Sequence, residues 1–90
     1  MFFYNHQQPP GPPPSYVPKK PNGTPSLKAV DPGAIRFCRY KFTYIWPENG
    51  RGFWTWLVFV GPTSVAGFRW TRRGWRFWGT DIRNIDSFYC

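Results

Sequence analysis

The stretch F-R-W-T-R-R-G-W-R-F-W, from Phe68 to Trp78, carries three tryptophans and four arginines in one short run. Gly74 favours a left-handed backbone, so it predicts a tight loop that folds the stretch into a β-hairpin. The resulting register places Arg69 directly opposite Arg76. Like charges in this position repel, which indicates a surface that holds an anion or stacks the guanidinium groups on aromatic rings.

Outside this hairpin, turn residues recur between segments rich in β-branched and aromatic residues. This pattern is typical of all-β domains with short strands. We therefore predict an all-β fold, either a small antiparallel meander or a five-stranded SH3-like barrel, without a helix of useful length. The predicted turns are Asp31–Gly33, Pro47–Gly50, Gly61–Ser64 and Thr71–Gly74.

Asn49 and Gly50 are the strongest turn signal, because both residues tolerate the positive φ of a type I′ turn. A two-residue turn at this place sets Phe42 opposite Leu57, and the following turn sets Leu57 beside Phe68. Since side chains alternate between the faces of a sheet, the hairpins together predict one inner, apolar face. Its predicted members are Cys38, Tyr40, Phe42, Tyr44, Trp46, Phe53, Leu57, Phe59, Ala66, Phe68, Trp70, Trp75 and Phe77.

The predicted outer face combines tryptophans with basic side chains. Its members are Arg39, Lys41, Thr43, Trp54, Trp56, Arg69, Arg76 and Trp78. On such a face the tryptophans would stack bases or sugar rings, while the basic groups would attract phosphate or other anions. The alternative is that the protein itself covers the tryptophans, by docking a proline-rich segment or by self-association.

The first third of the chain has a different composition from the rest. Residues 1–30 hold eight of the eleven prolines, interspersed with polar residues. Such a segment has too little apolar surface to offset its chain entropy, so we predict a disordered or polyproline II arm. Residues 31–90 then form one small β-domain. A domain of this size is marginally stable alone, which favours an oligomer, a crosslink or a partner.

The formal net charge is +8, and basic residues occur along the whole chain. This excess favours an anionic partner such as nucleic acid or an acidic polysaccharide. Residues 1–6 have neither a basic region nor an apolar region of signal-peptide length, so we expect cytoplasmic synthesis without a signal peptide. No apolar run has the length of a transmembrane helix, and we expect no membrane span.

The two cysteines, Cys38 and Cys90, are too few for a zinc site, and we expect no metal. In a cytosolic chain such a pair is usually reduced. The alternative is a disulfide that ties the start of the domain to its C-terminus or links neighbouring molecules.

Catalysis is not expected from this sequence. The one histidine, His6, lies in the arm, so Cys38 has no base in the domain to activate its thiol. Neither a paired-carboxylate motif nor a glycine-rich phosphate loop is present, and we expect neither a cofactor nor an enzymatic activity.

Four segments carry a resemblance to known proteins. They are V-D-P-G-A-I-R at 30–36, C-R-Y-K-F-T-Y-I-W at 38–46, S-V-A-G-F-R-W at 64–70 and I-D-S-F-Y-C at 85–90, after a proline-rich arm. In this order they resemble short, uncharacterised Trp-rich proteins of spore-forming Gram-positive bacteria. The resemblance assigns no activity to any residue. It implies a setting, which is deposition in the spore coat, where cysteine oxidation and tyrosine crosslinking would be useful.

Together these features predict a non-enzymatic structural or adhesive protein that associates through its Arg/Trp face. The alternative is a module that binds single-stranded nucleic acid or an anionic polysaccharide. A structural protein should associate as its concentration rises and should tolerate salt, whereas a polyanion binder should lose its ligand steeply as salt rises.

Overall fold

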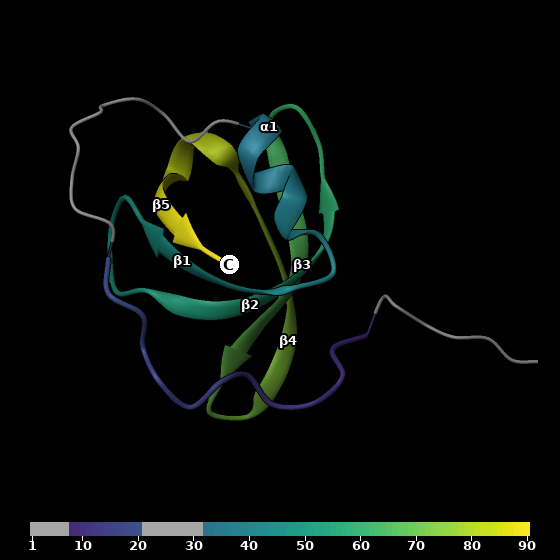
Figure 1. The fold of residues 1–90 in the computed structure, drawn as a ribbon, viewed down its shortest axis with the longest axis vertical. Coiled ribbons are helices and arrows are strands. Elements are labelled where there is room, and N and C mark those ends of the chain that lie inside the picture. The colour runs from purple at the N-terminus through teal and green to yellow at the C-terminus, as the bar shows by residue number, and fades with distance from the viewer. Residues whose placement is uncertain (1–7, 21–31) are drawn as a thin grey trace, which may run out of the picture.

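The computed structural model describes residues 8–20 and 32–90 (Figure 1). Five antiparallel strands form one sheet in the order β4-β3-β2-β1-β5, which confirms the predicted all-β class. The first predicted turn begins at Asp31, which lies outside the described residues. In chain order the elements are α1 (Pro32–Ile35), the 3₁₀ helix η1 (Arg36–Cys38), β1 (Phe42–Pro47), β2 (Phe53–Val60), β3 (Ser64–Thr71), β4 (Gly74–Asp81), the 3₁₀ helix η2 (Ile82–Asn84) and β5 (Ile85–Tyr89).

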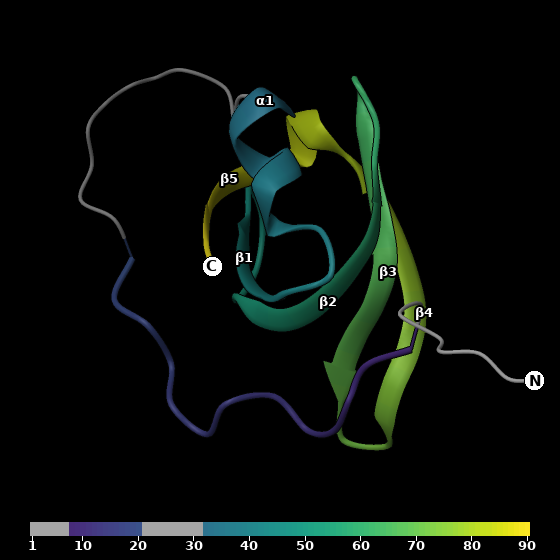
Figure 2. The ribbon, with the colours of Figure 1, turned by 45° about the vertical axis from the view of Figure 1, so that its right-hand side comes forward.

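The sheet is strongly coiled but open. Strands β4 and β5 are its two edges, joined in sequence through η2 rather than by strand pairing. Figures 1 and 2 show the sheet curling around the short segment α1–η1, which lies on its concave side. The convex side faces the arm formed by residues 8–20.

The hydrophobic core fills the space between α1–η1, η2 and the concave side of the sheet. Its buried members are Ile35, Cys38, Ile45, Leu57, Val65, Ile82 and Ile85. Ile35 and Cys38 are three positions apart, so one face of the helical segment delivers both side chains to the core. This is a small core for a chain of this length, and the molecule therefore depends on contacts outside it.

The start of the domain corrects the sequence-based prediction. We expected a strand containing Cys38 and Tyr40, but Pro32 opens a short helical segment and β1 begins only at Phe42. Tyr40 has a positive φ of 62°, which interrupts extended backbone at this point. None of the helices in residues 8–20 and 32–90 has the length and hydropathy that a membrane crossing requires.

The β3–β4 hairpin follows the predicted register. Arg69 pairs with Arg76, Trp70 with Trp75, and Gly74 has the expected positive φ of 96°. The prediction is correct because the register of a tight hairpin depends almost entirely on its loop.

The β1–β2 pairing differs from the prediction by one residue. Phe42 pairs with Trp56, not with Leu57. Gly50 has a positive φ of 100°, but Asn49 does not, so the predicted type I′ turn is wrong and the connection is longer. A shift of one residue exchanges the two faces of a strand, so in β1 the side chains of Thr43 and Ile45 point to the core.

A β-bulge in β2 shifts the β2–β3 pairing as well. Phe59 pairs with Ala66 as predicted, but beyond the bulge Leu57 pairs with Gly67 instead of Phe68. Val58 is the extra residue between these pairs. The bulge therefore turns the side chain of Phe68 to the convex side of the sheet.

The predicted inner face is therefore wrong for β1, β3 and β4. In β2, Phe53 and Leu57 do lie on the concave side, packed in or against the core. Phe59, expected inside, is 50% exposed. The aromatic residues that we assigned to the core from the other three strands lie on the convex side instead.

A disulfide joins Cys38 to Cys90, with the sulfur atoms 2.02 Å apart. The expectation of two reduced thiols is therefore wrong, and of the two disulfides that the sequence left open this is the intramolecular one. It ties η1, inside the coil, to the end of the chain after the edge strand β5.

Removal of this disulfide should destabilise the domain strongly. The bond closes a loop across a sequence separation of 52. Loop-closure entropy for such a length corresponds to about 4 kcal/mol in the free energy of unfolding. Guanidinium denaturation of Cys38→Ser/Cys90→Ser should show this loss relative to the oxidised wild type. The reduced wild type is the control and should behave like the variant, whereas equal midpoints for all three proteins would contradict the prediction.

Gly67 should be intolerant of any side chain. A Cβ atom at this position would overlap the carbonyl oxygen of Trp56 at the bulge, and its three nearest neighbours, in Trp56, Leu57 and Val58, are all backbone atoms. We expect Gly67→Ala to lower the free energy of unfolding by at least about 2 kcal/mol. Gly79→Ala is the matched control, because its Cβ would lie 3.2 Å from the nearest atom, the Val65 carbonyl oxygen. Equal stability of the two variants in urea denaturation would refute the role of this close approach.

Candidate functional site

The convex side of the sheet carries a continuous layer of aromatic rings, here called the aromatic face. Its members are Phe42, Tyr44, Trp46, Trp54, Trp56, Phe68, Trp70, Trp75 and Phe77. Neighbouring rings contact one another across the strands. Phe42 meets Trp56 edge-on at 5.0 Å between centroids, and Trp70 meets Trp75 at 5.0 Å. Edge-to-face contacts of this kind stabilise the layer beyond its burial.

The arm lies against the aromatic face and is held by two indole groups. Trp75 Nε1 donates a hydrogen bond of 2.8 Å to the carbonyl oxygen of Gly11, and Trp54 Nε1 donates one of 3.0 Å to that of Tyr16. The Tyr16 ring also packs edge-on against Trp54, at 5.8 Å. Proline-rich backbone has few internal hydrogen bonds, so its carbonyl oxygens are available to such donors.

Two further contacts hold the end of the arm near β5. Lys20 forms an ion pair with Asp86. Tyr16 lies beside Tyr89, and although its side chain is half exposed, the pKa of its hydroxyl is raised, first by desolvation and then by Tyr89. The neutral form of Tyr16 is therefore favoured while the arm is docked.

Lys41 belongs to this side of the molecule. It lines a pocket of about 390 Å³ with Tyr16, Trp54, Trp56 and Tyr89. Both tryptophans are largely covered, with exposed fractions of 7% for Trp54 and 8% for Trp56. They are therefore not the open stacking platforms that we predicted.

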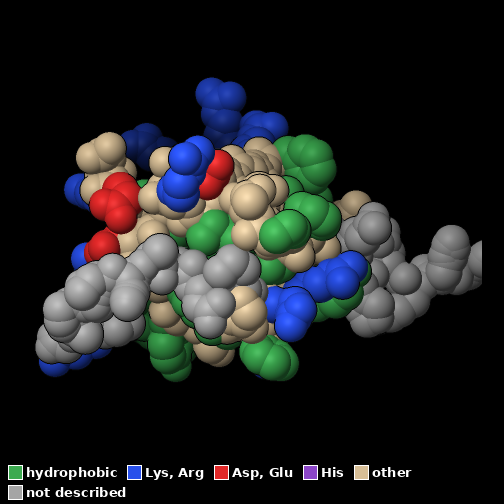
Figure 3. Space-filling model, turned by 90° about the horizontal axis from the view of Figure 1, so that it is seen from above, with side chains coloured by type: hydrophobic (Ala, Val, Ile, Leu, Met, Phe, Trp, Pro, Cys, Tyr) green, Lys and Arg blue, Asp and Glu red, His purple; other side chains and the backbone are tan. Residues whose placement is uncertain are grey.

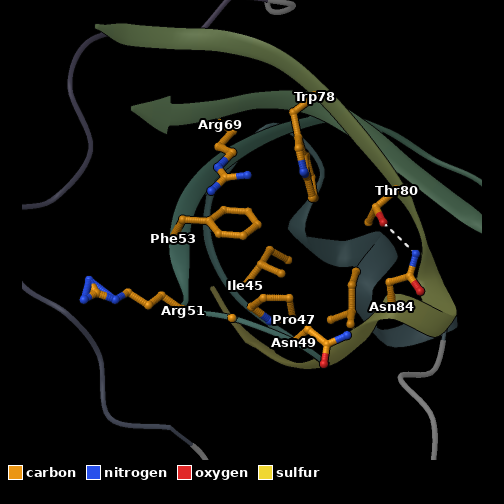
Figure 4. Close-up of a pocket in the computed structure, with 11 residues that line it drawn as sticks. Ile45, Pro47, Asn49, Arg51, Phe53, Arg69, Trp78, Thr80 and Asn84 are labelled. Atoms are coloured by element: carbon orange, nitrogen blue, oxygen red, sulfur yellow. Dashed lines mark hydrogen bonds between the residues drawn. The ribbon is translucent and has the colours of Figure 1, made fainter. Parts of the chain in front are cut away.

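The predicted site residues Arg69, Arg76 and Trp78 lie on the concave side. The guanidinium carbon of Arg69 lies 4.0 Å from the centroid of the Phe53 ring, and Phe53 meets Trp78 edge-on at 5.4 Å. Arg69, Phe53 and Trp78 line an open pocket of about 230 Å³ (Figure 4), whereas Arg76, the cross-strand partner of Arg69, lies outside its lining. We call it the arginine pocket; it is also lined by Ile45, Pro47, Asn49, Gly50, Arg51, Thr80, Asn84 and Ile85.

The side chain of Arg39 binds the β2 backbone at the bulge and packs on Tyr40. Its Nε donates to the carbonyl oxygen of Val58 at 3.1 Å, one of its terminal nitrogens donates to the Tyr40 hydroxyl at 3.0 Å, and the guanidinium lies over the Tyr40 ring. The backbone N–H of Tyr40 donates a hydrogen bond of 2.7 Å to the carbonyl oxygen of Leu57. Arg39 and Tyr40 thus satisfy two carbonyl groups of β2 next to the bulge, beyond the Phe42–Trp56 pair at which the β1–β2 ladder ends.

The structure divides the predicted site between two surfaces. Lys41, Trp54 and Trp56 lie under the arm, Arg69, Arg76 and Trp78 lie on the concave side, and Arg39 braces the bulge. Thr43, predicted beside them, is buried and donates through its hydroxyl to the Lys41 carbonyl oxygen, at 3.1 Å. A single Arg/Trp face is therefore wrong, because the bulge and the shifted β1–β2 register separate its members.

Sequence reasoning missed residues in both surfaces. In the arginine pocket these are Phe53, Thr80 and Asn84, which come from three different elements. On the aromatic face it missed the role of Trp75, which we assigned to the core. An accessible signal did exist for Trp75, since an indole N–H needs a hydrogen-bond acceptor that an apolar core does not supply.

The chain matches no protein-family model, and comparisons with curated proteins and with solved structures find no significant similarity. The site is therefore interpreted from its own geometry. No group of three or more His, Cys, Asp or Glu side chains in residues 8–20 and 32–90 is arranged to hold a metal ion.

Docking of the arm should weaken at alkaline pH. The docked pKa of Tyr16 is raised above its ordinary value of 10.0. The stabilisation is therefore complete below about pH 10 and is lost as the pH rises through the docked pKa. Tryptophan fluorescence should report this release, and Tyr16→Phe should lack the step. A fluorescence transition that is identical in wild type and Tyr16→Phe would exclude Tyr16 as its cause.

Proposed function

We propose that this protein is a non-enzymatic structural or adhesive protein whose aromatic face binds proline-rich chain. Its own arm occupies this face within one molecule, and arms exchanged between molecules link copies to one another. The observation that carries the proposal is the pair of hydrogen bonds from Trp54 and Trp75 to the carbonyl oxygens of Tyr16 and Gly11.

The two hydrogen bonds suit recognition of an extended, proline-rich backbone. An indole is a donor only, so it selects a carbonyl oxygen that is not already engaged. The two acceptors are five residues apart, which in polyproline II corresponds to about 15 Å. Proline-rich chain loses little conformational entropy when it docks, and this is the physical basis of its recognition by aromatic grooves.

Arm exchange follows from the connectivity. Residues 21–31 join the arm to the domain, and the same contacts form whether the arm belongs to the same copy or to a neighbour. The balance then depends on the protein concentration relative to the effective concentration of the tethered arm, which is in the millimolar range for short linkers. Deposition in a spore coat, the setting that the resemblance suggests, would supply such concentrations.

Surface beyond the arm offers a neighbouring copy a further contact. Phe77 belongs to the aromatic face and is 77% exposed. It lies on β4, an edge strand whose outer backbone groups have no strand partner in the described residues. Exposed aromatic side chains on an open edge favour association between chains.

The alternative function, a module for single-stranded nucleic acid or anionic polysaccharide, depends on the arginine pocket of the opposite face. The two functions use different residues, so each can be tested without the other.

Removal of the indole donors should weaken self-association. Trp54→Phe/Trp75→Phe keeps aromatic rings but deletes both hydrogen bonds, each contributing about 1 kcal/mol. We expect the self-association constant from sedimentation velocity to fall by at least about tenfold. The control is Trp70→Phe, on the same face, whose indole forms no hydrogen bond with another described residue.

A synthetic peptide of residues 8–20 provides an independent measurement. It should compete with exchanged arms and dissociate the wild-type oligomers, and moderate salt should have little effect on them. Full-length protein that remains monomeric up to millimolar concentration would refute arm exchange. Oligomers that are equally stable in the double variant and in Trp70→Phe would show that the indole bonds are not responsible.

A further inference from the structure

The concave side of the β3–β4 hairpin holds two cations without counterions. Arg69 and Arg76 are direct cross-strand partners, a placement that destabilises a sheet when both charges are alike. Neither forms an ion pair with a described residue. The ion pairs in the described part of the chain are Lys20 with Asp86 and Arg83 with Asp81.

Acidic groups are also absent from the lining of the arginine pocket. Asp81 is nearby in sequence, but Arg83 holds it through its backbone N–H and its guanidinium, which lowers the pKa of the Asp81 carboxyl. In the view of Figure 3 basic side chains are spread over the surface, while acidic ones are few and lie beside them or toward one side. The described residues that line the pocket therefore carry a net positive charge, and Glu48, between Pro47 and Asn49 in sequence, is the acidic residue beside them.

Arg69 is positioned by an aromatic ring rather than by an acid. Its guanidinium stacks over Phe53 at 4.0 Å and points into the pocket, whereas Arg51 extends away from it (Figure 4). Stacking occupies the face of the guanidinium and leaves its N–H groups at the edge. Arg69 makes no hydrogen bond to another described residue, so these donors are available to a bound anion.

The rest of the pocket lining offers a second aromatic ring and amide groups. The Trp78 indole projects from β4 into the pocket (Figure 4). Asn84 Nδ2 donates a hydrogen bond of 3.1 Å to the Thr80 hydroxyl, which fixes the orientation of the Asn84 amide. Asn49 lines the same pocket from the β1–β2 connection. A ligand that fits would carry an anionic group next to a flat ring with hydrogen-bonding edges.

We propose that the arginine pocket binds single-stranded nucleic acid, with a phosphate at Arg69 and Arg76 and a base against Trp78. A nucleotide joins the required groups in one unit, because its base has both a π-face and an edge with donors and acceptors. Asn49 and Asn84 are the residues that contact the base edge. Arg72 and Arg73, exposed at the tip of the same hairpin, meet further phosphates along the strand.

This inference does not depend on arm docking, since the arginine pocket and the aromatic face lie on opposite sides of the sheet. Bound strand should show the salt dependence of phosphate contacts. With Arg69, Arg72, Arg73 and Arg76 each neutralising one phosphate, the logarithm of the association constant should fall against that of salt concentration with a slope of about −3.

The test is fluorescence anisotropy of a labelled oligothymidine of about twelve nucleotides, within the usual site size of small β-domains. The wild-type protein is compared at low and moderate salt with Arg69→Gln and Arg76→Gln. We expect each substitution to weaken binding by about tenfold and to reduce the salt slope by about 0.7. Arg36→Gln is the matched control. It removes the same charge from an exposed residue of η1 that lies outside the pocket.

Each outcome decides for or against the pocket. Loss of affinity in Arg69→Gln and Arg76→Gln but not in Arg36→Gln supports it. Equal losses in all three would show diffuse attraction by net charge and overturn it, as would the absence of binding at low salt. Heparin binding tighter than the oligonucleotide at equal salt would overturn the nucleic-acid assignment in favour of a sulfated polysaccharide. Circular dichroism of each variant verifies that the fold is retained.

Discussion

The bulge in β2 is the constraint on which both surfaces of this protein depend. On one side of it Phe59 pairs with Ala66, and on the other Leu57 pairs with Gly67, so one residue of β2 has no partner in β3. At the bulge, the carbonyl groups of Leu57 and Val58 accept hydrogen bonds from Tyr40 and Arg39. The absence of a side chain at Gly67 lets β3 approach the Trp56 carbonyl group closely.

The bulge places aromatic and basic residues of β2, β3 and β4, which alternate in the sequence, on opposite sides of the sheet. Beyond the bulge Trp56 lies opposite Phe68, while Thr55 lies opposite Arg69. Aromatic rings therefore collect on the convex side and the arginine pair on the concave side. Indole groups can then donate to the neutral backbone of the arm without competition from guanidinium groups, and the arginines line or flank the proposed anion site without burying their charge.

Stability in this molecule comes from outside the core as well as from within it. The core is small, and the disulfide and the docked arm both restrain parts of the chain that the core does not cover. Small domains commonly need such additions, because their buried area barely offsets their conformational entropy. The arm thus covers the aromatic face and, in the arm exchange that we propose, is the segment that a neighbouring copy would supply.

The sequence alone determined the all-β class, the β3–β4 hairpin and the pairing of Arg69 with Arg76. These follow from the alternation of side chains along the strands and from one local loop closed by Gly74. Only the tertiary structure decided which face of each strand is buried. The Asn49–Gly50 connection and the bulge near Val58 each shift the pairing by one residue, and such a shift reverses every side chain beyond it. The groups that contact the bulge, Arg39 and Tyr40, are some twenty residues before it in sequence, so a local pattern does not reveal it. Docking of the arm was equally hidden, because its indole donors are 38 and 64 residues away in sequence from the carbonyl groups that they bind.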